Sequence, residues 1–491
     1  MTPGELIFGG GLVSTVYLML AVPLVAAIVL AALPWHRVSS VLNAAASLLT
    51  LAMAISLLFG TRPKPTNFIF IDDLNVSLIV LTSLVAFTTS WFSASYIAHE
   101  VEIGRLTPLS LRFYHAMYQV LSAAMILALC ANNIGVMWVA IEAATLTTVV
   151  MVSIYRTRES LEAAWKYFIL CSVGIALALF GTILVYLAGQ TVIGPGVEAL
   201  AWTELHARAA AFDPNILNLA FVFLLVGYGT KVGLAPLHAW LPDAHAEGPT
   251  PISAVLSGLM LNVALYALLR FKMILAGNAG AIAPGPLMLT MGLSSLLLAS
   301  VMLYRRRDIK RFFAYSSIEH MGIITFAFGL GGPLANFAGL LHMVLHSLTK
   351  SAIFFAVGHI SQVKGTQRIA DMSGLTKTHP LLGWGFVLGV AAIAGLPPMG
   401  PFLSEFLVVT SAMARQPWLA VPVVLGLLLA FGALMMRLQQ IAFGEPRGGT
   451  APVSASLAPL YLQLAMVLVA GLWLPAPLVS WFQNVARLLG S

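Results

Sequence analysis

The residues best placed to do chemistry in this 491-residue sequence are ionisable side chains inside apolar segments. In GLLHMVLHSLTKSAIFF, His342, His346 and Lys350 recur every four residues, so a helix presents all three on one face. Imidazole takes and releases protons near neutral pH, and a desolvated lysine gives up its proton more readily. The row predicts a proton path, with packing roles for the histidines as the alternative. No metal site is expected, because no third ligand stands at suitable spacing.

A carboxylate and a second lysine lie equally deep in apolar sequence. Glu142 is central in IGVMWVAIEAATLTTVV, and Lys231 follows residues 218–230, which carry no formal charge. A charge at mid-bilayer costs about 2.5 to 3.5 kcal/mol, so such residues usually face the protein interior and pair. We expect Glu142 and Lys231 to form a buried pair whose protonation responds to a third charge. A static structural ion pair is the alternative.

Two adjacent residues in SSIEHMGII, Glu319 and His320, are further candidates. Neighbours on a helix point about 100° apart, so one of them can face the row while the other faces elsewhere. Glu319 has an equal alternative, which is to pair with Arg311 or Lys310 near the helix end.

Two more polar residues extend the candidate set. Glu405 follows the Pro-rich stretch AGLPPMGPFLS, where freed backbone carbonyls can tune its titration. Asn262, in SGLMLNVALYALLR, cannot titrate, so it can pass a proton only by holding water.

Composition places these residues in a membrane protein. The chain is 59% hydrophobic and 9% charged, whereas soluble domains are about a quarter charged. The net charge of +7 comes from short clusters between apolar segments, which is typical of topology signals and not of nucleic-acid binding. Cys130 and Cys171 lie in apolar segments without a CxxC motif, and no GxGxxG is present. No cofactor, metal or catalytic residue of its own is therefore expected.

Apolar segments long enough to cross a bilayer predict an all-α polytopic membrane protein of about 14 transmembrane helices. They lie near 12–34, 38–60, 74–97, 115–131, 133–155, 164–188, 215–240, 250–275, 284–304, 311–331, 335–360, 381–410, 417–443 and 457–482.

The seventh and twelfth of these segments are expected to be broken helices. The seventh carries Gly229, Gly233 and Pro236, and the twelfth carries the stretch AGLPPMG. Interrupted helices at matching places in two halves are a feature of inverted-repeat transporters. We therefore expect a single domain with two inverted five-helix repeats, although simple kinking is an alternative. Helices 1–3 occupy residues 1–110, the repeats 111–280 and 281–445, and helix 14 residues 446–491.

Loops after odd-numbered segments hold most of the Lys and Arg residues, including the cluster from Arg305 to Arg311. The positive-inside rule then places both termini outside the cytoplasm. The stretch HAWLPDAHAEGPTP is expected at the non-cytoplasmic mouth as a capping loop. The alternatives are a metal or substrate site and, as the main functional option, a funnel for protons. The titratable side chains of this stretch are His238, Asp243, His245 and Glu247.

Three features together resemble a known family: TKVGLAPLHAWLPDAHAEGPTPISAVLSGL, HMVLHSLTKSAIFF and the mid-segment Glu142. They are similar to the antiporter-like subunits of respiratory complex I, Mrp cation antiporters and membrane-bound hydrogenases. SSIEHMG with LMLNVALYALLRFK is most similar to the F-type subunit of hydrogenase-4. The resemblance implies a half-channel pair, Glu142 with Lys231. It also implies a central axis through Asn262, His320, His342, His346, Lys350 and Glu405. Asn262 departs from the family, which usually has Lys or His there.

The resemblance implies a proton-translocating subunit of a hydrogenase-4, formate-hydrogenlyase or complex I-like redox complex in the cell membrane. Its expected partners are other membrane and peripheral subunits, the lipid bilayer, and protons or Na⁺. Alternatives are a subunit of a stand-alone Na⁺/H⁺ antiporter, a subunit of a proton-driven bicarbonate-uptake module, and a structural anchor without ion transport.

Overall fold

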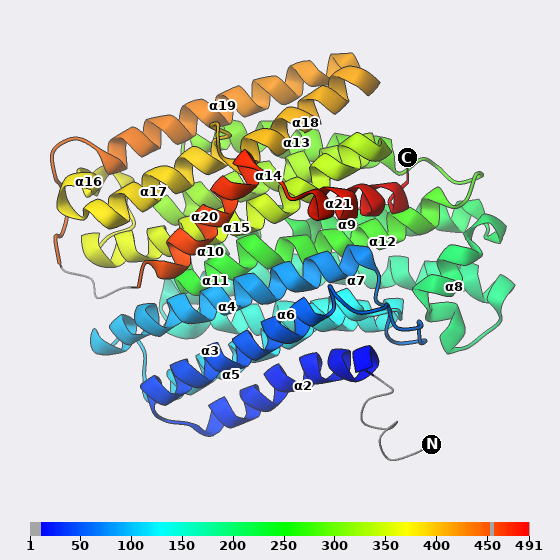
Figure 1. The fold of residues 1–491 in the computed structure, drawn as a ribbon, viewed down its shortest axis with the longest axis horizontal. Coiled ribbons are helices and arrows are strands. Elements are labelled where there is room, and N and C mark those ends of the chain that lie inside the picture. The colour runs from blue at the N-terminus through cyan, green and yellow to red at the C-terminus, as the bar shows by residue number, and fades with distance from the viewer. Residues whose placement is uncertain (1–10, 452–455, 491) are drawn as a thin grey trace.

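The computed structural model describes residues 11–451 and 456–490, and within these ranges the chain is a bundle of helices with only isolated β-bridges (Figure 1). Eleven helices there are long and apolar enough to cross a membrane, or 12 with one bent pair. Helix α14 (Ile309–Leu330) and the pair α17 (Pro380–Ile393) and α18 (Gly400–Arg415) occupy two further predicted segments. Every predicted segment is therefore helical in the structure.

The other long helices are α2 (Gly11–Ala32), α3 (His36–Ser56), α4 (Asp73–Glu102), α5 (Pro108–Cys130), α6 (Ile134–Val152), α7 (Arg158–Ile193), α9 (Pro214–Val232), α12 (Leu261–Ala276), α13 (Gly285–Leu303), α15 (Gly332–Lys364), α19 (Pro417–Ala442), α20 (Ala458–Leu472) and α21 (Ala476–Leu488). Shorter helices are α8 (Trp202–Ala207), α10 (Trp240–Glu247), α11 (Thr250–Val255) and α16 (Leu375–Thr378).

Both predicted helix breaks are present. Helix α9 ends where Gly233 adopts a left-handed conformation with φ +80°, and α10 starts only at Trp240. Helix α17 ends at Ile393, and Gly395 has φ +68° before α18 begins. Proline has no amide hydrogen to continue a helix, which accounts for the interruption in both places.

The last predicted segment is bent, which its hydropathy does not predict. Helices α20 and α21 meet at an angle of 82°. Pro475 immediately precedes α21, and proline disfavours helical conformation in the residue before it. The chain therefore turns at this point instead of continuing as one straight helix.

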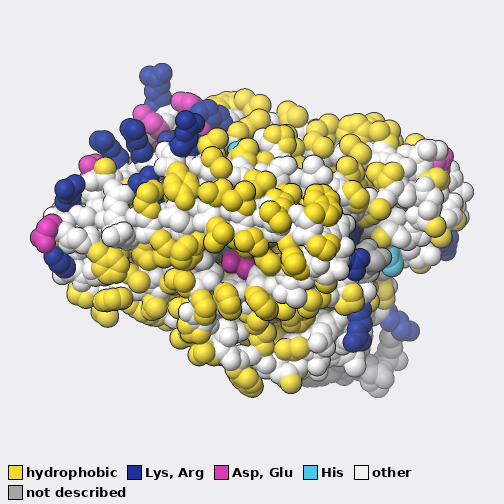
Figure 2. Space-filling model, turned by 90° about the horizontal axis from the view of Figure 1, so that it is seen from above, with side chains coloured by type: hydrophobic (Ala, Val, Ile, Leu, Met, Phe, Trp, Pro, Cys, Tyr) yellow, Lys and Arg dark blue, Asp and Glu magenta, His cyan; other side chains and the backbone are white. Residues whose placement is uncertain are grey.

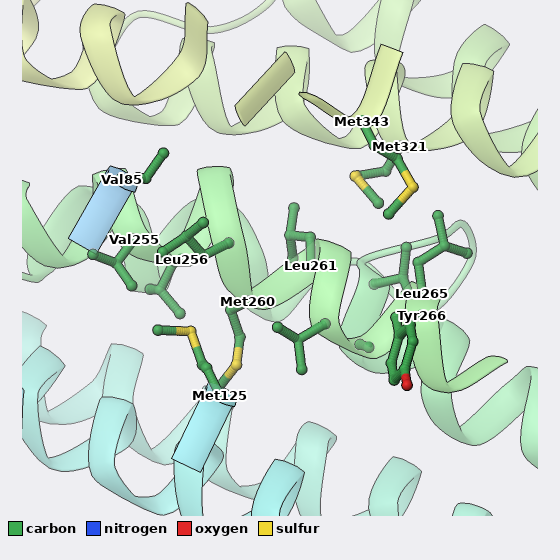
Figure 3. Close-up of a cluster of buried hydrophobic side chains, with 14 of the residues drawn as sticks. Val85, Met125, Val255, Leu256, Met260, Leu261, Leu265, Tyr266, Met321 and Met343 are labelled. Carbon is green, nitrogen blue, oxygen red and sulfur yellow. The ribbon is translucent and has the colours of Figure 1, made fainter. Parts of the chain in front are cut away.

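The centre of the bundle is the segment that runs from α11 to α12. The two helices are joined by a π-helical turn, Leu256–Met260, and the membrane-spanning window of this segment is 100% buried. Figure 3 shows the apolar side chains around it, with Met125 beside Met260 and Met321 beside Met343. A π-turn widens the helix and is common at functional sites.

Close glycine contacts hold neighbouring helices together. A Cβ atom at Gly292 of α13 would lie 2.6 Å from the backbone nitrogen of Phe326 and 2.7 Å from the carbonyl oxygen of Gly322, both on α14. The two backbones are therefore in contact. Lipid chains are as apolar as the side chains, so helices in membranes associate through such small residues.

Lys and Arg side chains form a larger group at one end of the bundle and a smaller group at the other (Figure 2). Arg311, at the end with the larger group, pairs with Asp243 at 3.2 Å and with Glu247 at 3.1 Å, and Lys166 lies 3.3 Å from Asp243. The expectation that HAWLPDAHAEGPTP lies at the mouth opposite the Arg-rich loops is therefore wrong. Helix α9 crosses the bundle once, and its continuation emerges beside Arg311. Helix α2 begins and α21 ends at the opposite end of the bundle (Figure 1).

A buried ion pair ties α4 to α12 near that opposite end. Arg270 donates to both carboxylate oxygens of Asp72, at 2.8 and 2.7 Å, and its guanidinium lies 4.5 Å from the Trp202 ring centroid. Burial raises the pKa of Asp72, but the charge and hydrogen bonds of Arg270 lower it further, so the pKa lies below the usual range. Asp72 therefore adds stability above the aspartate pKa of the unfolded chain, and this stability is lost as pH falls through the lower folded pKa.

Asp72→Asn is expected to lower the free energy of unfolding at pH 7 by about 3 to 5 kcal/mol, because it leaves a buried guanidinium without its counter-charge. The variant should also lose part of the acid dependence of stability below about pH 4. Denaturant unfolding of the protein in detergent at pH 7 and in acid measures both. The control is Asp371→Asn, which breaks the exposed pair with Arg368 at 3.6 Å and should cost under about 1 kcal/mol. Equal losses in the two variants would contradict the assignment.

Candidate functional site

Lys231 lies in the last turn of α9, and its side chain is 1% exposed. The ammonium donates a hydrogen bond to the Tyr167 hydroxyl at 2.7 Å and lies 4.6 Å from the centroid of the same ring. Trp240 stacks on Tyr167 with 4.4 Å between ring centroids. Lys231 is therefore held by a neutral hydroxyl and aromatic faces.

The helix break builds this cage. Because α9 stops, the Thr230 carbonyl accepts from the amide of Gly233 at 3.1 Å, and the indole nitrogen of Trp240 also donates to it at 2.8 Å. On the other side, the Tyr167 hydroxyl lies 2.7 Å from the Thr148 hydroxyl of α6. The tyrosine is thus fixed between α6 and α9.

The predicted direct pair between Glu142 and Lys231 is not formed. Among the described residues, no carboxylate lies within 4 Å of the Lys231 ammonium. Glu142 lies on α6 as an electrostatic neighbour of Lys231, and its buried Oε2 has no hydrogen-bond partner. Lys231 therefore contacts a neutral partner, Tyr167, and has the Glu142 carboxylate as a more distant electrostatic neighbour.

Asn262 joins the central helix to α15. Its amide nitrogen donates to the Ser347 hydroxyl at 2.7 Å and to the carbonyls of Met343 and Gly258 at 3.3 and 3.4 Å. The Gly258 carbonyl belongs to the π-turn and also accepts from the Ser347 hydroxyl. The buried Oδ1 of Asn262 has no partner.

The predicted row on α15 is confirmed as a shared face, and it meets α14. The His342 and His346 rings both lie against His320, with centroid distances of 5.1 and 5.6 Å. His320 Nδ1 is 2.9 Å from His342 Nε2, and His342 Nδ1 is 2.8 Å from the Ser404 hydroxyl. Lys350 donates to the Phe313 carbonyl at 3.0 Å. All four ionisable side chains of this cluster are buried.

Two carboxylates flank His320. Its Nε2 lies 3.9 Å from Glu319 Oε2, and its Nδ1 lies 3.9 Å from Glu405 Oε1. Glu319 therefore faces the row, and of its two predicted alternatives the pairing with Arg311 or Lys310 is not adopted. Lys310 instead donates to the carbonyls of Ala246 and Gly248 at 3.3 and 2.8 Å.

Three donor atoms converge in this cluster. One ligand atom each from His320, His342 and Glu405 lies within 4.8 Å of the others, a set that could hold a divalent ion. The two histidines of this set are His320 and His342, not the HxxxH pair His342 and His346, because His346 lies outside the set. In this structure His320 and His342 hydrogen-bond to each other.

His238 is not brought into the row. It is half-buried in the break between α9 and α10, with its ring edge-on to Tyr315 at 6.0 Å. His245, from the same stretch, is fully buried against Phe354, with 4.9 Å between centroids and no partner for either ring nitrogen.

Sequence reasoning missed a polar cavity at the Arg-rich end. Two adjoining volumes of about 390 and 380 Å³ share Tyr96, Arg105 and Gln367 in their walls. Lys310 lines the first and Glu100 the second, and both side chains are buried. Lys310 opens an apolar segment, so the sequence predicts for it only a topology role or a pairing with Glu319.

Sequence reasoning also missed Tyr167 and Ser404, the hydrogen-bond partners of Lys231 and His342. The only signal for Ser404 is its place directly before Glu405. Tyr167 comes from another helix, and no local spacing points to it.

Comparisons with known proteins show what the chain is similar to. Residues 131–431 match the family described as NADH:quinone oxidoreductase/Mrp antiporter, transmembrane. The chain is 60% identical over 467 residues to the hydrogenase-4 component F homolog of Methylacidiphilum infernorum (isolate V4), which covers 95% of this chain and 98% of that protein.

Two solved structures share the fold. A chain of the membrane-bound sulfane sulfur reductase, an archaeal respiratory membrane complex, superposes with a TM-score of 0.86 at 22% identity, covering 96% of this chain and 97% of that one. A chain of respiratory complex I from Thermus thermophilus superposes with a TM-score of 0.81 at 21% identity, covering 97% of this chain and 100% of that one.

Double-mutant cycles distinguish the observed partner of Lys231 from the predicted one. Tyr167→Phe combined with Lys231→Met should give a coupling energy of about 1 to 3 kcal/mol, because Tyr167 and Lys231 are in contact. Glu142→Gln with Lys231→Met should couple by less than about 1 kcal/mol. Denaturant unfolding in detergent measures both cycles, and a larger coupling to Glu142 would contradict the structure.

Proposed function

Because this chain belongs to the NADH:quinone oxidoreductase/Mrp antiporter transmembrane family, we propose that it is a proton-translocating membrane subunit of a hydrogenase-4 or complex I-like redox complex. The observation that carries the proposal is the buried cluster on α14, α15 and α18. There His320 links two further imidazoles and two carboxylates inside the bundle. Ionisable groups in a membrane interior are rare and mark ion pathways.

The cluster has the spacing of a proton relay. The bond between His320 and His342 is short enough for direct transfer, at 2.9 Å. Each carboxylate lies 3.9 Å from His320, so a side-chain rotation or one water completes the step. Protons would pass from Lys350 through this cluster to Glu405 beside the break.

Lys231 has the two partners that a switch requires. It donates to Tyr167 in this structure, and Glu142 is its alternative charged partner. A redox-driven charge shift in neighbouring subunits would exchange one partner for the other. Moving one charge against 100 mV costs about 2.3 kcal/mol, which corresponds to a pKa change of under about two units.

The region between the two lysines is neutral. Asn262 offers only its free Oδ1 to a water molecule, and the methionines nearby are flexible enough to admit water (Figure 3). A proton would therefore cross this region only while water is present.

The polar cavity supplies access from the Arg-rich end. Lys310 lines it with its ammonium on two carbonyls, and the unpartnered imidazole of His245 is an electrostatic neighbour of both Lys310 and Lys350. The positive-inside rule makes this the cytoplasmic end and places both termini outside the cytoplasm. The partners are then the other membrane and peripheral subunits of the redox complex.

Lys231→Ala in the intact complex is expected to lower the number of protons moved per electron at least about tenfold, because the switch loses its charge. Proton uptake into inverted membrane vesicles, measured with electron flow in the same sample, gives this ratio.

The matched control is Lys272→Ala, which removes a lysine that is also 1% exposed but donates to the Leu489 carbonyl, away from the row. It should leave the ratio unchanged. An unaltered number of protons per electron in Lys231→Ala, or an equal loss in both variants, would contradict the proposed function.

A further inference from the structure

A cavity of about 270 Å³ opens on the membrane-facing side of the bundle, between the α17–α18 break and α19. Glu319 and Glu405 form its polar part, and Phe402, Phe406 and Phe431 are among its walls. Figure 2, which looks onto the α19 side, shows acidic atoms in a gap in the middle of an otherwise apolar face. An acid at such a place is open to molecules dissolved in the bilayer.

The carboxylates of this cavity lack donors. Among the described residues none donates a hydrogen bond to Glu405, whose closest basic atom is His320 Nδ1 at 3.9 Å, and Oε2 of Glu319 is buried without a partner. Gly395 makes room for this arrangement, because a Cβ atom there would collide with Oε2 of Glu405. The acids are thus exposed to whatever fills the cavity.

The lining selects the ligand class. A cation gains from a carboxylate in low dielectric and from aromatic faces nearby. Hard cations such as Mg²⁺ and Ca²⁺ need several more oxygen ligands than this cavity provides, and an acyl chain would leave both acids unpaired. We propose that this lateral cavity binds an amphipathic cation, a protonated amine on an apolar body, which enters from the bilayer and places its charge at Glu405.

The test follows the reactivity of Glu405 with dicyclohexylcarbodiimide in membranes that contain the full-length chain. The carboxylic acid adds across one C=N bond: its oxygen bonds to the central carbon, its proton moves to nitrogen, and the adduct rearranges to a stable N-acylurea. Mass spectrometry of the Glu405 peptide gives the rate.

N,N-dimethyloctylamine should slow this labelling about tenfold, while n-decanol, of similar size but neutral, should slow it less than about twofold. Equal protection by both compounds would show that the cavity binds apolar chains only, and no protection by the amine would show that it binds neither. Either result overturns the proposal.

A second readout uses a filled cavity. Leu428→Trp adds bulk to a wall residue on α19, whereas Val421→Trp adds the same bulk to an exposed residue of α19 outside the cavity. The amine should raise the thermal unfolding midpoint of the wild type and of Val421→Trp but not of Leu428→Trp. An equal rise in all three would place the amine elsewhere. Neither readout measures transport, so the site stands or falls independently of proton translocation.

Discussion

The cost of keeping charge in an apolar bundle is the constraint on which the rest of this structure depends. The charged side chains of the described residues compensate this cost to different extents. Arg270 has a bidentate carboxylate and aromatic neighbours, and Lys310 has two carbonyls, so both are fixed. Lys231 has a single neutral acceptor, and both nitrogens of His346 have no partner. Within the candidate site, Lys231 and His346 are therefore the groups with the fewest hydrogen-bond partners, and they are free to change partner or protonation.

The two helix breaks place one charge each. Lys231 is in the last turn of α9, where the helix dipole favours a cation, and the break that follows supplies Trp240 to cover it. Glu405 lies in α18 just after the second break, where Gly395 leaves space for its carboxylate. In each case the interruption of the backbone creates the room and the polar groups that an uninterrupted helix would not offer. Each helix break is thus combined with one buried ionisable group, which is the base Lys231 at the first break and the acid Glu405 at the second.

Hydropathy and spacing were enough to predict every membrane segment, both breaks and the shared face of His342 and His346, since all of these are local properties of a helix. Partners supplied by other helices were not predictable. Tyr167 takes the place expected for Glu142 because of how α7 packs, which no spacing along the chain encodes. The side of the bundle on which Asp243 lies was predicted wrongly, although its stretch follows the seventh segment and the alternation of loops alone puts it on the Arg-rich side. The ion pairs of Asp243 with Arg311 and Lys166 place it there. The π-turn beside Asn262 was also missed; its Gly258 carbonyl accepts from Ser347 of α15, a contact that no local spacing encodes.

The neutral centre of the proposed path follows from the same constraint. A lysine in place of Asn262 would need an acceptor for a third buried charge between Lys231 and Lys350, and the nearby groups are a serine, two carbonyls and methionines. Asn262 uses its amide nitrogen to hold α12 to α15 and leaves one oxygen free. In the proposed path, the two charged regions would thereby be separated by a region without an ionisable side chain, and water would have to carry a proton across it. Control of water in this region would then decide when the two charged regions communicate, so the packing of the methionines becomes part of the proposed transport mechanism.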